Sequence, residues 1–500
     1  MVEKTESNVS DKQKNFQVEK PGITVKKQED FSEWYTQVVL KAELADYSSG
    51  KGFIVIRPNG YEIWENVKNF FDAEIKKTGH RNAYFPTLIP ESLLKKEAEH
   101  FAGFVPEVFW VTKAGNNELS EPFAVRPTSE TIIHDAMKRW IRSWRDLPLL
   151  LNVWNSVLRA EIKSTKPFIR TTEFLWQEGH TAHSSEQEAE KEVSEILDLY
   201  KRVAEELLAV PVLIGKKSDK EKFVGAVYTT TLESIMPDGR ALQMGTSHHL
   251  GQNFSRPFEI RFLGEDGEMH YVWHTSWGIS WRTLGALIMT HGDDKGLILP
   301  PRVAPVQLVI VPIVFSESSK ANEVLSKCQE IKSQLQSSGF RVSLDSRENY
   351  TPGWKFNEWE MKGIPLRIEV GPRDISNKSV ILVRRDSGKK ESVPLEGLSQ
   401  TVLTLLEEIQ RSLWEKAKKL LEDKTKNAST FSELSEILDR DSGFVSTYWC
   451  GSRECEDQIK DKTGADIRVI PFGQPSDISG LNCVLCNGEA KFLVYFAKAY

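Results

Sequence analysis

The feature that most constrains the fold is a change of sequence texture at the proline-rich segment 300–305, PPRVAP. Before it, short β-rich stretches such as FAVRP, VYTTTLES and RALQMGTS indicate a mostly antiparallel sheet. After it, the continuous apolar run VQLVIVPIVF is typical of a buried strand, and helical and strand patterns then alternate. The 500 residues also exceed what one hydrophobic core usually organises, so we expect several domains.

Four segments account for the chain. The first is polar and poor in periodic apolar positions, which predicts a flexible tail. The third is a compact α/β module with strands expected at FRVSL, PLRIEV and SVILVRR, followed by a long helix at about 399–424. The expected bounds are 1–28 for the tail, 29–303 for the first domain, 304–407 for the α/β module, and 408–500 for a linker helix and a C-terminal domain.

Local patterns predict several elements of the first domain. FIVIRPNG (53–60) reads as a strand closed by an Asn-Gly turn, and residues 60–77 have helical apolar spacing. The run HRNAYFPTLIP (80–90) contains two prolines, which favours an edge strand or an interface segment. A clear amphipathic helix is expected at about 185–209.

Composition excludes several classes of protein. A net charge of -6 gives no overall attraction to nucleic acid, so RNA binding would depend on local basic patches. No apolar run approaches the roughly 18–20 residues that span a bilayer, and the first residues lack the apolar core of a secretory signal. We therefore expect a cytoplasmic protein with no membrane segment, whose cysteines are reduced.

The cysteines indicate a metal site. Cys450 and Cys455 form a C-x4-C pair, and Cys483 and Cys486 form a C-x2-C pair further on. Two such pairs in a reduced protein predict four thiolate ligands for a structural Zn²⁺ ion. Cys328 stands alone in a helical pattern and is expected to be a small core residue.

Three arginines have the chemistry of triphosphate ligands. They are Arg159 in LRAE, Arg170 in FIRTTEF and Arg282 in GISWRTLG. The guanidinium group is permanently charged and pairs with phosphate oxygens through two parallel hydrogen bonds. The sequence has neither a Walker A loop nor a GxGxxG turn, so side chains would have to replace their backbone cradle. Each arginine alone is more often structural, and the case depends on the surrounding residues.

The surrounding residues favour a pocket. The stretch EFLWQEGH (173–180) concentrates large polar and aromatic side chains that are costly to bury without partners. A surface strand could also carry them, but the mixture suits a pocket wall. QMGTSHHLGQNF (243–254) repeats this texture.

These segments resemble the class II aminoacyl-tRNA synthetases. RAE…FIRTTEFLWQEGH resembles their motif 2, TSWGISWRTLGALIMTHGDDKGLILPPRVAP (275–305) resembles motif 3, and GHRNAYFPTLIP (79–90) resembles motif 1. RPTSET (126–131), FLWQEGH and GTSHHLGQNF more narrowly resemble the prolyl-tRNA synthetases of the archaeal and eukaryotic type. The resemblance implies an α/β protein. Its parts would be a class II catalytic core on an antiparallel sheet flanked by helices, an α/β anticodon-binding domain, and a small zinc-binding α+β C-terminal domain.

The resemblance implies that L-proline is activated with ATP and Mg²⁺ and then transferred to the 3′ end of proline tRNA. It implies catalytic roles for Arg159, Arg282 and Glu161, the last through orienting a base or a neighbouring arginine. The implied ATP-binding residues are Arg159, Arg170, Thr171, Phe174, Gln243, Thr246, Ser280 and Arg282. The implied proline-binding residues are Thr128, Glu130, Arg159, Trp176, Glu178, His180 and His248. His180 and His248 could instead act through hydrogen bonds behind the pocket.

Further expectations concern tRNA and assembly. We expect Lys355, Glu369 and Arg373 on the anticodon-binding surface, although such charges are often only a solvated face. The resemblance implies a homodimer with Pro86 at its interface. Only about 60 residues separate His180 from Gln243, so we expect no editing domain.

Two residues depart from the family pattern, and two rival interpretations stay open. Thr172 stands where a second arginine is expected, and Trp281 stands where a threonine is common. The chain could be a class II enzyme for another amino acid, or an inactive tRNA-binding paralogue. The presence of the three arginines argues against an inactive protein.

Overall fold

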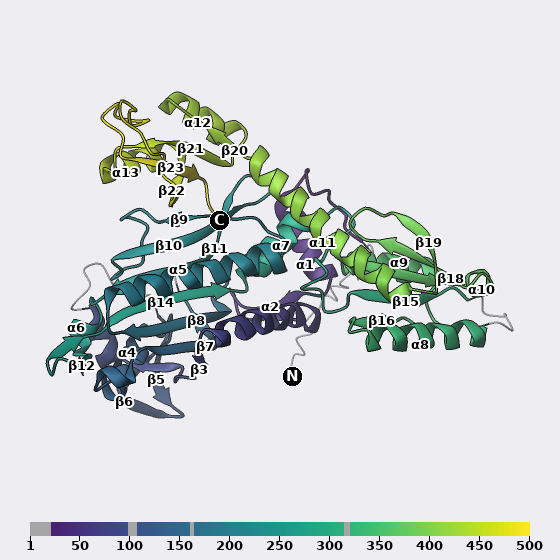
Figure 1. The fold of residues 1–500 in the computed structure, drawn as a ribbon, viewed down its shortest axis with the longest axis horizontal. Helices are drawn as coiled ribbons and strands as arrows, with labels where there is room; N and C mark the ends of the chain where they lie inside the picture. The colour runs from purple at the N-terminus through teal and green to yellow at the C-terminus, as the bar shows by residue number, and fades with distance from the viewer. Residues whose placement is uncertain (1–21, 99–107, 161–164, 315–320) are drawn as a thin grey trace, which may run out of the picture.

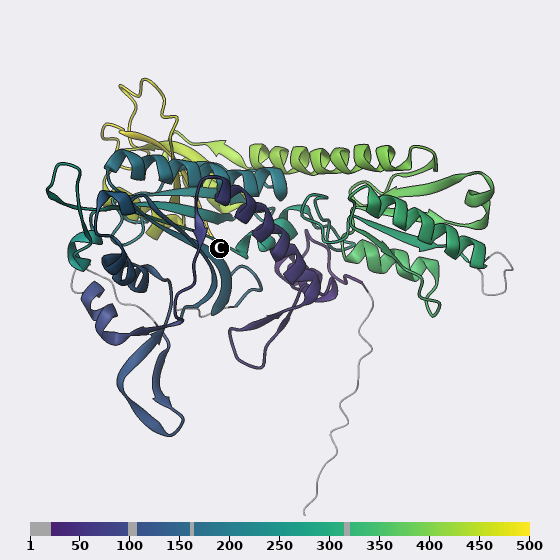
Figure 2. The ribbon, with the colours of Figure 1, turned by 60° about the horizontal axis from the view of Figure 1, so that its bottom comes forward.

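A computed structural model describes residues 22–98, 108–160, 165–314 and 321–500 (Figure 1). A large body, formed by the segments expected to be catalytic and named the catalytic body for that reason, and a smaller α/β module lie at opposite ends of the molecule. The long helix α11 (Leu398–Asp423) connects the module to the C-terminal unit (Figures 1 and 2). No described helix is long and apolar enough to cross a bilayer.

The described residues form one sheet of eleven strands, seven from the catalytic body and four, β20–β23, from the C-terminal unit. Its pairings are antiparallel except at the two edges, where β3 and β20 run parallel to their neighbours, so the expectation of a mostly antiparallel sheet is confirmed. From edge to edge, the strands are β20 (Thr425–Asn427), β21 (Phe444–Trp449), β23 (Phe492–Ala497), β22 (Asp466–Pro471), β9 (Leu213–Lys216), β10 (Tyr228–Ile235), β11 (Ala241–Gly251), β14 (Trp273–Ser280), β8 (Glu173–His183), β7 (Leu149–Leu158) and β3 (Arg81–Asn82).

The largest hydrophobic core lies between this sheet and the helices α1 and α2 from the N-terminal part, α5 between motifs 2 and 3, and α7 in motif 3. Burial of apolar surface stabilises this layer, in which Tyr200 of α5 and Trp277 of β14 are both fully buried. Helices α4 and α6 pack in a second core against β7 and β8. The bounds are α1 (Phe31–Lys41), α2 (Pro58–Lys77), α4 (Glu130–Trp140), α5 (Glu186–Arg202), α6 (Ser255–Phe258) and α7 (Arg282–His291).

Smaller elements complete the catalytic body. Helix α5 continues into a short π-helical segment, so the helix expected at 185–209 is confirmed in outline. These elements are β1 (Ala45–Tyr47), β2 (Ile54–Ile56), β4 (Leu88–Pro90), α3 (Glu91–Ala98), β5 (Trp110–Ala114), β6 (Asn117–Val125), η1 (Trp144–Asp146), η2 (Val203–Leu207), β12 (Arg261–Leu263) and β13 (Met269–Tyr271).

Two local predictions were wrong. Asn59 and Gly60 do not form a turn after β2, because Pro58 begins α2 there and both residues lie in its first turn. A side chain at Gly60 would come within 2.2 Å of the Leu44 carbonyl oxygen, so close backbone packing explains the glycine. The tail also ends earlier than residue 28, since Lys27 Nζ donates to the Gly292 carbonyl at 2.7 Å. Residues 1–21 lie outside the described residues.

The α/β module has its own five-stranded mixed sheet and its own core. Its strands, in spatial order, are β16 (Val342–Leu344), β15 (Leu308–Pro312), β17 (Leu366–Val370), β18 (Ser379–Arg384) and β19 (Lys390–Pro394), and its helices are α8 (Ala321–Ser337), α9 (Pro352–Met361), α10 (Pro372–Ser376) and the first half of α11. The C-terminal unit adds α12 (Phe431–Arg440) and α13 (Arg453–Thr463) to β20–β23.

Candidate active site

A cavity of about 250 Å³ lies above the open face of β8, β14, β11 and β10. A second cavity of about 330 Å³ adjoins it and shares four of its lining residues, Arg159, Phe174, Ser280 and Arg282. The predicted residues in the first cavity are Thr128, Glu130, Arg159, Phe174, Trp176, Glu178, Gln243, Thr246, His248, Ser280 and Arg282. Those in the second are Arg159, Arg170, Thr171, Phe174, Ser280 and Arg282. Glu161 lies outside the described residues.

Glu178 forms the acidic wall of the first cavity. Its carboxylate accepts hydrogen bonds from Asn155 Nδ2 at 2.7 Å, from the Ser129 amide at 3.2 Å and from the Ser129 hydroxyl. Burial would raise its pKa, but these donors and His180 hold it below the usual range. The wall therefore carries an ionised, fixed carboxylate, and the Thr128 hydroxyl donates to the neighbouring Glu130.

His180 lies behind this wall and does not line the cavity. It is buried, and its Nε2 lies 3.1 Å from Glu178 Oε2. Burial lowers the pKa of His180, but the Glu178 and Glu130 carboxylates raise it above its ordinary value. This geometry fits the alternative in which His180 orients Glu178.

His248 does line the cavity, as a neutral ring. Its Nδ1 lies 2.9 Å from the Thr229 hydroxyl and its Nε2 lies 3.1 Å from the Thr246 hydroxyl. Burial, with a smaller contribution from His180, lowers the pKa of His248 to about 3. The two hydroxyls fix the ring, which packs against Phe223 with ring centroids 4.8 Å apart.

The arginines gather where the two cavities meet. Arg159 lies over the rings of Phe174 and Trp176, 5.2 and 5.6 Å from their centroids. Arg282 Nε donates to the Ile169 carbonyl at 3.2 Å, and among the described residues no carboxylate forms an ion pair with it. Burial and the nearby positive charge of Arg159 lower the pKa of Arg282 to about 10. This excess of positive charge suits an anionic ligand.

Thr171 and Ser276 present hydroxyl groups to the cavities. Both side-chain oxygens are buried and have no hydrogen-bond partner among the described residues. Buried polar groups are normally hydrogen-bonded, so these hydroxyls are suited to a ligand that enters the site.

The two departures from the family pattern occupy tightly packed positions. A side chain on Gly52 would lie 2.2 Å from Thr172 Oγ1, and the Thr172 amide donates to the Gly52 carbonyl at 2.9 Å. The Thr172 side chain therefore packs directly on Gly52, which leaves no room there for a side chain at position 52. Trp281 is buried and meets Phe168 edge to face, with centroids 5.7 Å apart, so it forms part of the second cavity's wall.

The sequence analysis missed nine residues of the first cavity; four of them, Met244, Gly245, Trp277 and Gly278, lie on β11 and β14. Lys217, Glu221 and Phe223 come from the segment after β9, and Thr229 and Ser276 lie on β10 and β14. The segment GKKSDKEKF has no motif spacing, and its charges resemble an ordinary solvated loop. Alternation along β10 and β11 could have indicated Thr229, because it pairs with His248 on the same face.

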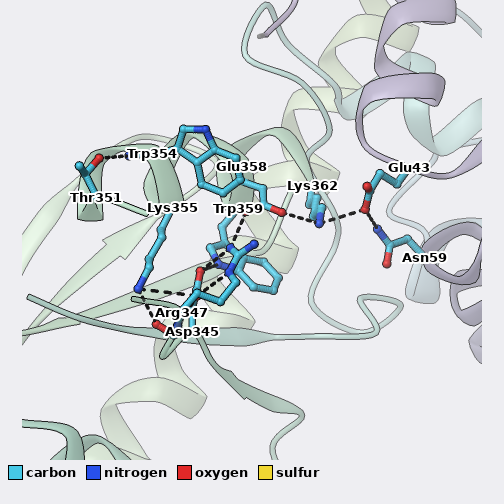
Figure 3. Close-up of polar contacts among 10 residues, drawn as sticks. All are labelled: Glu43, Asn59, Asp345, Arg347, Thr351, Trp354, Lys355, Glu358, Trp359 and Lys362. Atoms are coloured by element: carbon cyan, nitrogen blue, oxygen red, sulfur yellow. Dashed lines mark hydrogen bonds and ion pairs between the residues drawn. The ribbon is translucent and has the colours of Figure 1, made fainter. Parts of the chain in front are cut away.

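The predicted anticodon-binding residues need a correction. Lys355 and Glu369 are only 5% and 4% exposed, so their expected surface position was wrong. Lys355 Nζ donates to the Asp345 carbonyl at 3.0 Å, and Glu369 forms ion pairs with Arg367 and Lys390 (Figure 3 draws the first contact). Both side chains stabilise the edge of the module. Arg373 is exposed on α10.

A different group is exposed beside them. The rings of Tyr350 and Trp354 stack with centroids 3.9 Å apart, and both are about 40% exposed. The guanidinium of Arg347 lies over both rings. It also forms ion pairs with Asp345 and Glu358 (Figure 3). Stacked aromatic rings with an arginine are typical of surfaces that bind unpaired bases.

The four predicted zinc ligands come together at the end of the C-terminal unit. Their sulfur atoms all lie within 4.8 Å of one another, with Cys450 and Cys486 3.8 Å apart. Sulfurs at ~2.3 Å from a tetrahedral zinc ion would be about 3.8 Å apart, so the cluster fits such an ion. Burial opposes ionisation of Cys483, but the Cys486 and Leu485 amides lower its pKa to about 7. Cys328 is buried in the module core, as expected.

Three family models match the chain. The "tRNA synthetase class II core domain (G, H, P, S and T)" matches residues 109–291, the "Anticodon binding domain" matches 307–405, and "Prolyl-tRNA synthetase, C-terminal" matches 431–500. These matches agree with the three structural parts described above.

Curated relatives match almost the whole chain. Proline–tRNA ligase of Cenarchaeum symbiosum is 55% identical over 96% of this chain and 100% of its own. Proline–tRNA ligase of Alkaliphilus oremlandii is 53% identical over 98% and 100%, and proline–tRNA ligase 2 of Clostridioides difficile is 51% identical over 95% and 97%. At this identity and coverage, the chain belongs to the proline–tRNA ligases, a family of class II aminoacyl-tRNA synthetases.

Proposed function

We propose that the two cavities bind L-proline and ATP side by side and form prolyl-adenylate where they meet. A carboxylate oxygen of proline attacks the α-phosphorus of ATP, and pyrophosphate leaves with its electron pair. No general base is needed, because the attacking carboxylate is already ionised. Catalysis then consists of positioning and charge neutralisation, for which fixed cations in a closed site are well suited.

The proline end is the acidic wall. The ionised Glu178, with Glu130 and Thr128, suits the secondary ammonium group of proline, and the rings of Trp176 and Phe223 suit its compact apolar ring. His180 holds Glu178 from behind and His248 closes the floor as a neutral group.

The phosphate end is the arginine group. Arg159 lies between the acidic wall and the second cavity, so it is placed to hold the proline carboxylate and the α-phosphate together. Arg170 and Arg282 would hold the outer phosphates, while Phe174, Thr171 and Ser280 would contact the nucleotide. Mg²⁺ enters with ATP and neutralises phosphate charge, and we place Gln243 beside it.

The single observation that carries this proposal is the meeting of an anionic wall and a cationic group at Arg159. The test is ATP–pyrophosphate exchange with each of the twenty amino acids. Exchange with proline alone is the expected result. Exchange with a different amino acid would indicate another class II specificity, and no exchange with any would indicate an inactive paralogue.

The module would bind the anticodon of proline tRNA. We propose that its contact surface is the stacked pair Tyr350–Trp354 with Arg347, together with Arg373, and that Lys355 and Glu369 support this edge from inside. Residues 184–240 between motifs 2 and 3 form α5 and η2, which pack on the large sheet, and β9 and β10, which are strands of it. We propose no editing activity for them.

Zinc would be structural. All four ligand positions are supplied by cysteines, which leaves none for a reactant. We expect one zinc ion per chain by mass spectrometry of the metal content, and loss of that ion in Cys486→Ser but not in Cys328→Ser. Retention of zinc by Cys486→Ser would contradict the assignment.

We also propose a cytoplasmic homodimer of the archaeal and eukaryotic type. Pro86 is exposed in the motif 1 segment, and so are the apolar side chains of Tyr84, Leu88 and Trp110 around it. Large exposed apolar groups of this kind favour a protein interface. Sedimentation equilibrium should give the mass of a dimer for the wild-type protein. Leu88→Glu should shift the monomer–dimer equilibrium toward monomer. A wild-type protein with the mass of a monomer would contradict this.

A further inference from the structure

Three charged side chains that the proposed mechanism does not use meet beside the first cavity, and one of them, Lys217, lines it. Lys217 Nζ lies 2.6 Å from Glu233 Oε1, and Arg468 Nη2 lies 2.9 Å from the same oxygen. Arg468 also reaches Glu233 Oε2, at 3.0 Å. All three side chains are buried, with exposed fractions of 6%, 0% and 7% for Lys217, Glu233 and Arg468.

The three residues come from different parts of the chain. Glu233 lies on β10 and pairs across the strand with Gln243, and Lys217 directly follows β9. Arg468 lies on β22 of the C-terminal unit, which joins the catalytic sheet through antiparallel pairing with β9 (Figure 1). A side chain on Gly215 would come within 2.2 Å of the Ile470 carbonyl oxygen, so glycine permits this close approach of the two units.

The group has an unbalanced charge. One carboxylate faces two cations, and the pKa of Glu233 is held below its usual range, against its burial, by Lys217 and Arg468. Burying a net positive charge is costly unless an anion approaches it. Two further carboxylates act on these cations at longer range, Glu221 on both and Asp466 on Arg468, but among the described residues neither forms an ion pair with them. Lys217 itself lines the cavity that holds Arg159, Gln243 and Arg282.

We propose that Lys217 is a further binding residue for a nucleotide phosphate, and that Arg468 is a positioning residue supplied by the C-terminal unit. Because Arg468 also pairs with the Glu233 carboxylate, that carboxylate neutralises the Lys217 ammonium only in part. Lys217 also lines the cavity, where a phosphate can contact it. The proposal rests on the proposed function, since the phosphate would belong to ATP and pyrophosphate or to the 3′ end of the tRNA.

The experiment compares Lys217→Met with Lys220→Met in the full chain. Lys220 lies in the same segment and pairs with Asp457 of the C-terminal unit at 2.7 Å, but it does not line the cavity, so it controls for domain docking. Lys217→Met leaves the buried pair Glu233–Arg468 with balanced charge, which favours retention of the fold. Melting temperature and zinc content are measured on each variant.

Two assays distinguish the source of the phosphate. If it belongs to ATP, Lys217→Met loses about 10- to 100-fold in kcat/KM for ATP and pyrophosphate in tRNA-independent exchange, as expected for a lost hydrogen bond to a charged group. If it belongs to the tRNA end, exchange is normal and single-turnover transfer from preformed prolyl-adenylate slows by a similar factor. In both cases KM for proline is unchanged and Lys217→Arg restores most of the loss.

Arg468→Met tests the positioning role. It leaves Lys217 paired with Glu233 alone, so the same assay should lose a smaller factor than in Lys217→Met. Normal kinetics for Lys217→Met in both assays, or an equal loss in Lys220→Met, would overturn the proposal. Wild-type exchange that fails with proline would instead overturn the proposed function, because the variants are compared only where the wild type is active.

Discussion

The cations of the catalytic cavity and those of the α/β module are partnered in opposite ways. In the cavity, Arg282 is held by a backbone carbonyl and is surrounded by further positive charge. In the module, Arg367 and Arg384 form ion pairs with Glu369 and Asp386 at 3.0 and 2.9 Å. A cation that is positioned by neutral groups keeps its charge for a ligand, whereas a cation paired one to one with a carboxylate uses most of its charge to stabilise the fold. Lys217 and Arg347 differ from both cases, because Lys217 shares one carboxylate with Arg468 and the guanidinium of Arg347 lies over two exposed rings. The comparison teaches which arginines to regard as functional.

Removing the central cation should have the largest effect. Arg159→Ala is expected to lower proline-dependent ATP–pyrophosphate exchange by about 10²–10⁴-fold, because a fixed charge that stabilises the transition state is lost. The melting temperature should change little. The matched control is Arg139→Ala, since Arg139 is an exposed arginine paired with Asp135. Near-normal exchange in Arg159→Ala would show that the cavity cations are not the functional ones.

The second largest expected effect is that acid destabilises the catalytic domain more than the module. All ten histidines precede residue 300, and burial lowers the pKa of His274 to about 3 and that of His291 to about 4. Because these folded-state pKa values lie below the ordinary 6.5, the unfolded state binds more protons as pH falls through that range. Each such histidine then costs about 2 kcal/mol at pH 5.

The module depends on carboxylates that titrate lower. Despite burial, Arg347 and Trp359 hold the pKa of Asp345 at about 2, so its contribution is lost only as pH falls below the ordinary carboxyl range of about 4. Hydrogen exchange should be measured at pH 5 and pH 7 and corrected for intrinsic rates. Peptides of the catalytic domain should then be less protected at pH 5 than at pH 7, whereas peptides from 307–394 should be equally protected at both. Equal loosening of both regions would break the comparison.

The exposed aromatic pair offers a third test. Trp354→Ala is expected to raise KM for tRNA by about 5- to 100-fold, the range for loss of one stacked base, and to leave pyrophosphate exchange without tRNA unchanged. Phe340→Leu, a partly buried change in the module core, is the control for altered folding. An unchanged KM for tRNA in Trp354→Ala would remove this surface from anticodon binding.

The smallest effect is expected between the two regions. Lys362 of the module pairs with Glu43 of the catalytic body at 3.0 Å, and Glu43 in turn pairs with Arg57 (Figure 3 shows the Lys362 and Asn59 contacts of Glu43). Since these side chains are partly exposed, Lys362→Met should cost at most about 1 kcal/mol of stability. Calorimetry should show a decrease in melting temperature close to that of Lys327→Met. The pair of Lys327 with Glu330 lies within α8. A much larger shift would show that this contact fixes the two bodies.

The sequence by itself determined the local features that obey simple rules. Helical spacing predicted α2 and α5, the continuous apolar run predicted β15, and the cysteine spacing predicted the four-sulfur cluster. The arginines and the EFLWQEGH run predicted that one site joins positive charge to an acidic, aromatic wall, because these residue types are costly to bury otherwise.

Only the tertiary structure decided which charged groups face a ligand. Lys355 and Glu369 carry the same charges as surface residues, but the fold of the module buries them against Asp345 and Lys390, which lie on neighbouring segments of the same module. Lys217 lies in an ordinary charged segment, yet strand pairing between β22 and β9 brings Arg468 to Glu233 beside it. A charge acquires its role from its solvation and its partners, and both depend on contacts that span hundreds of residues.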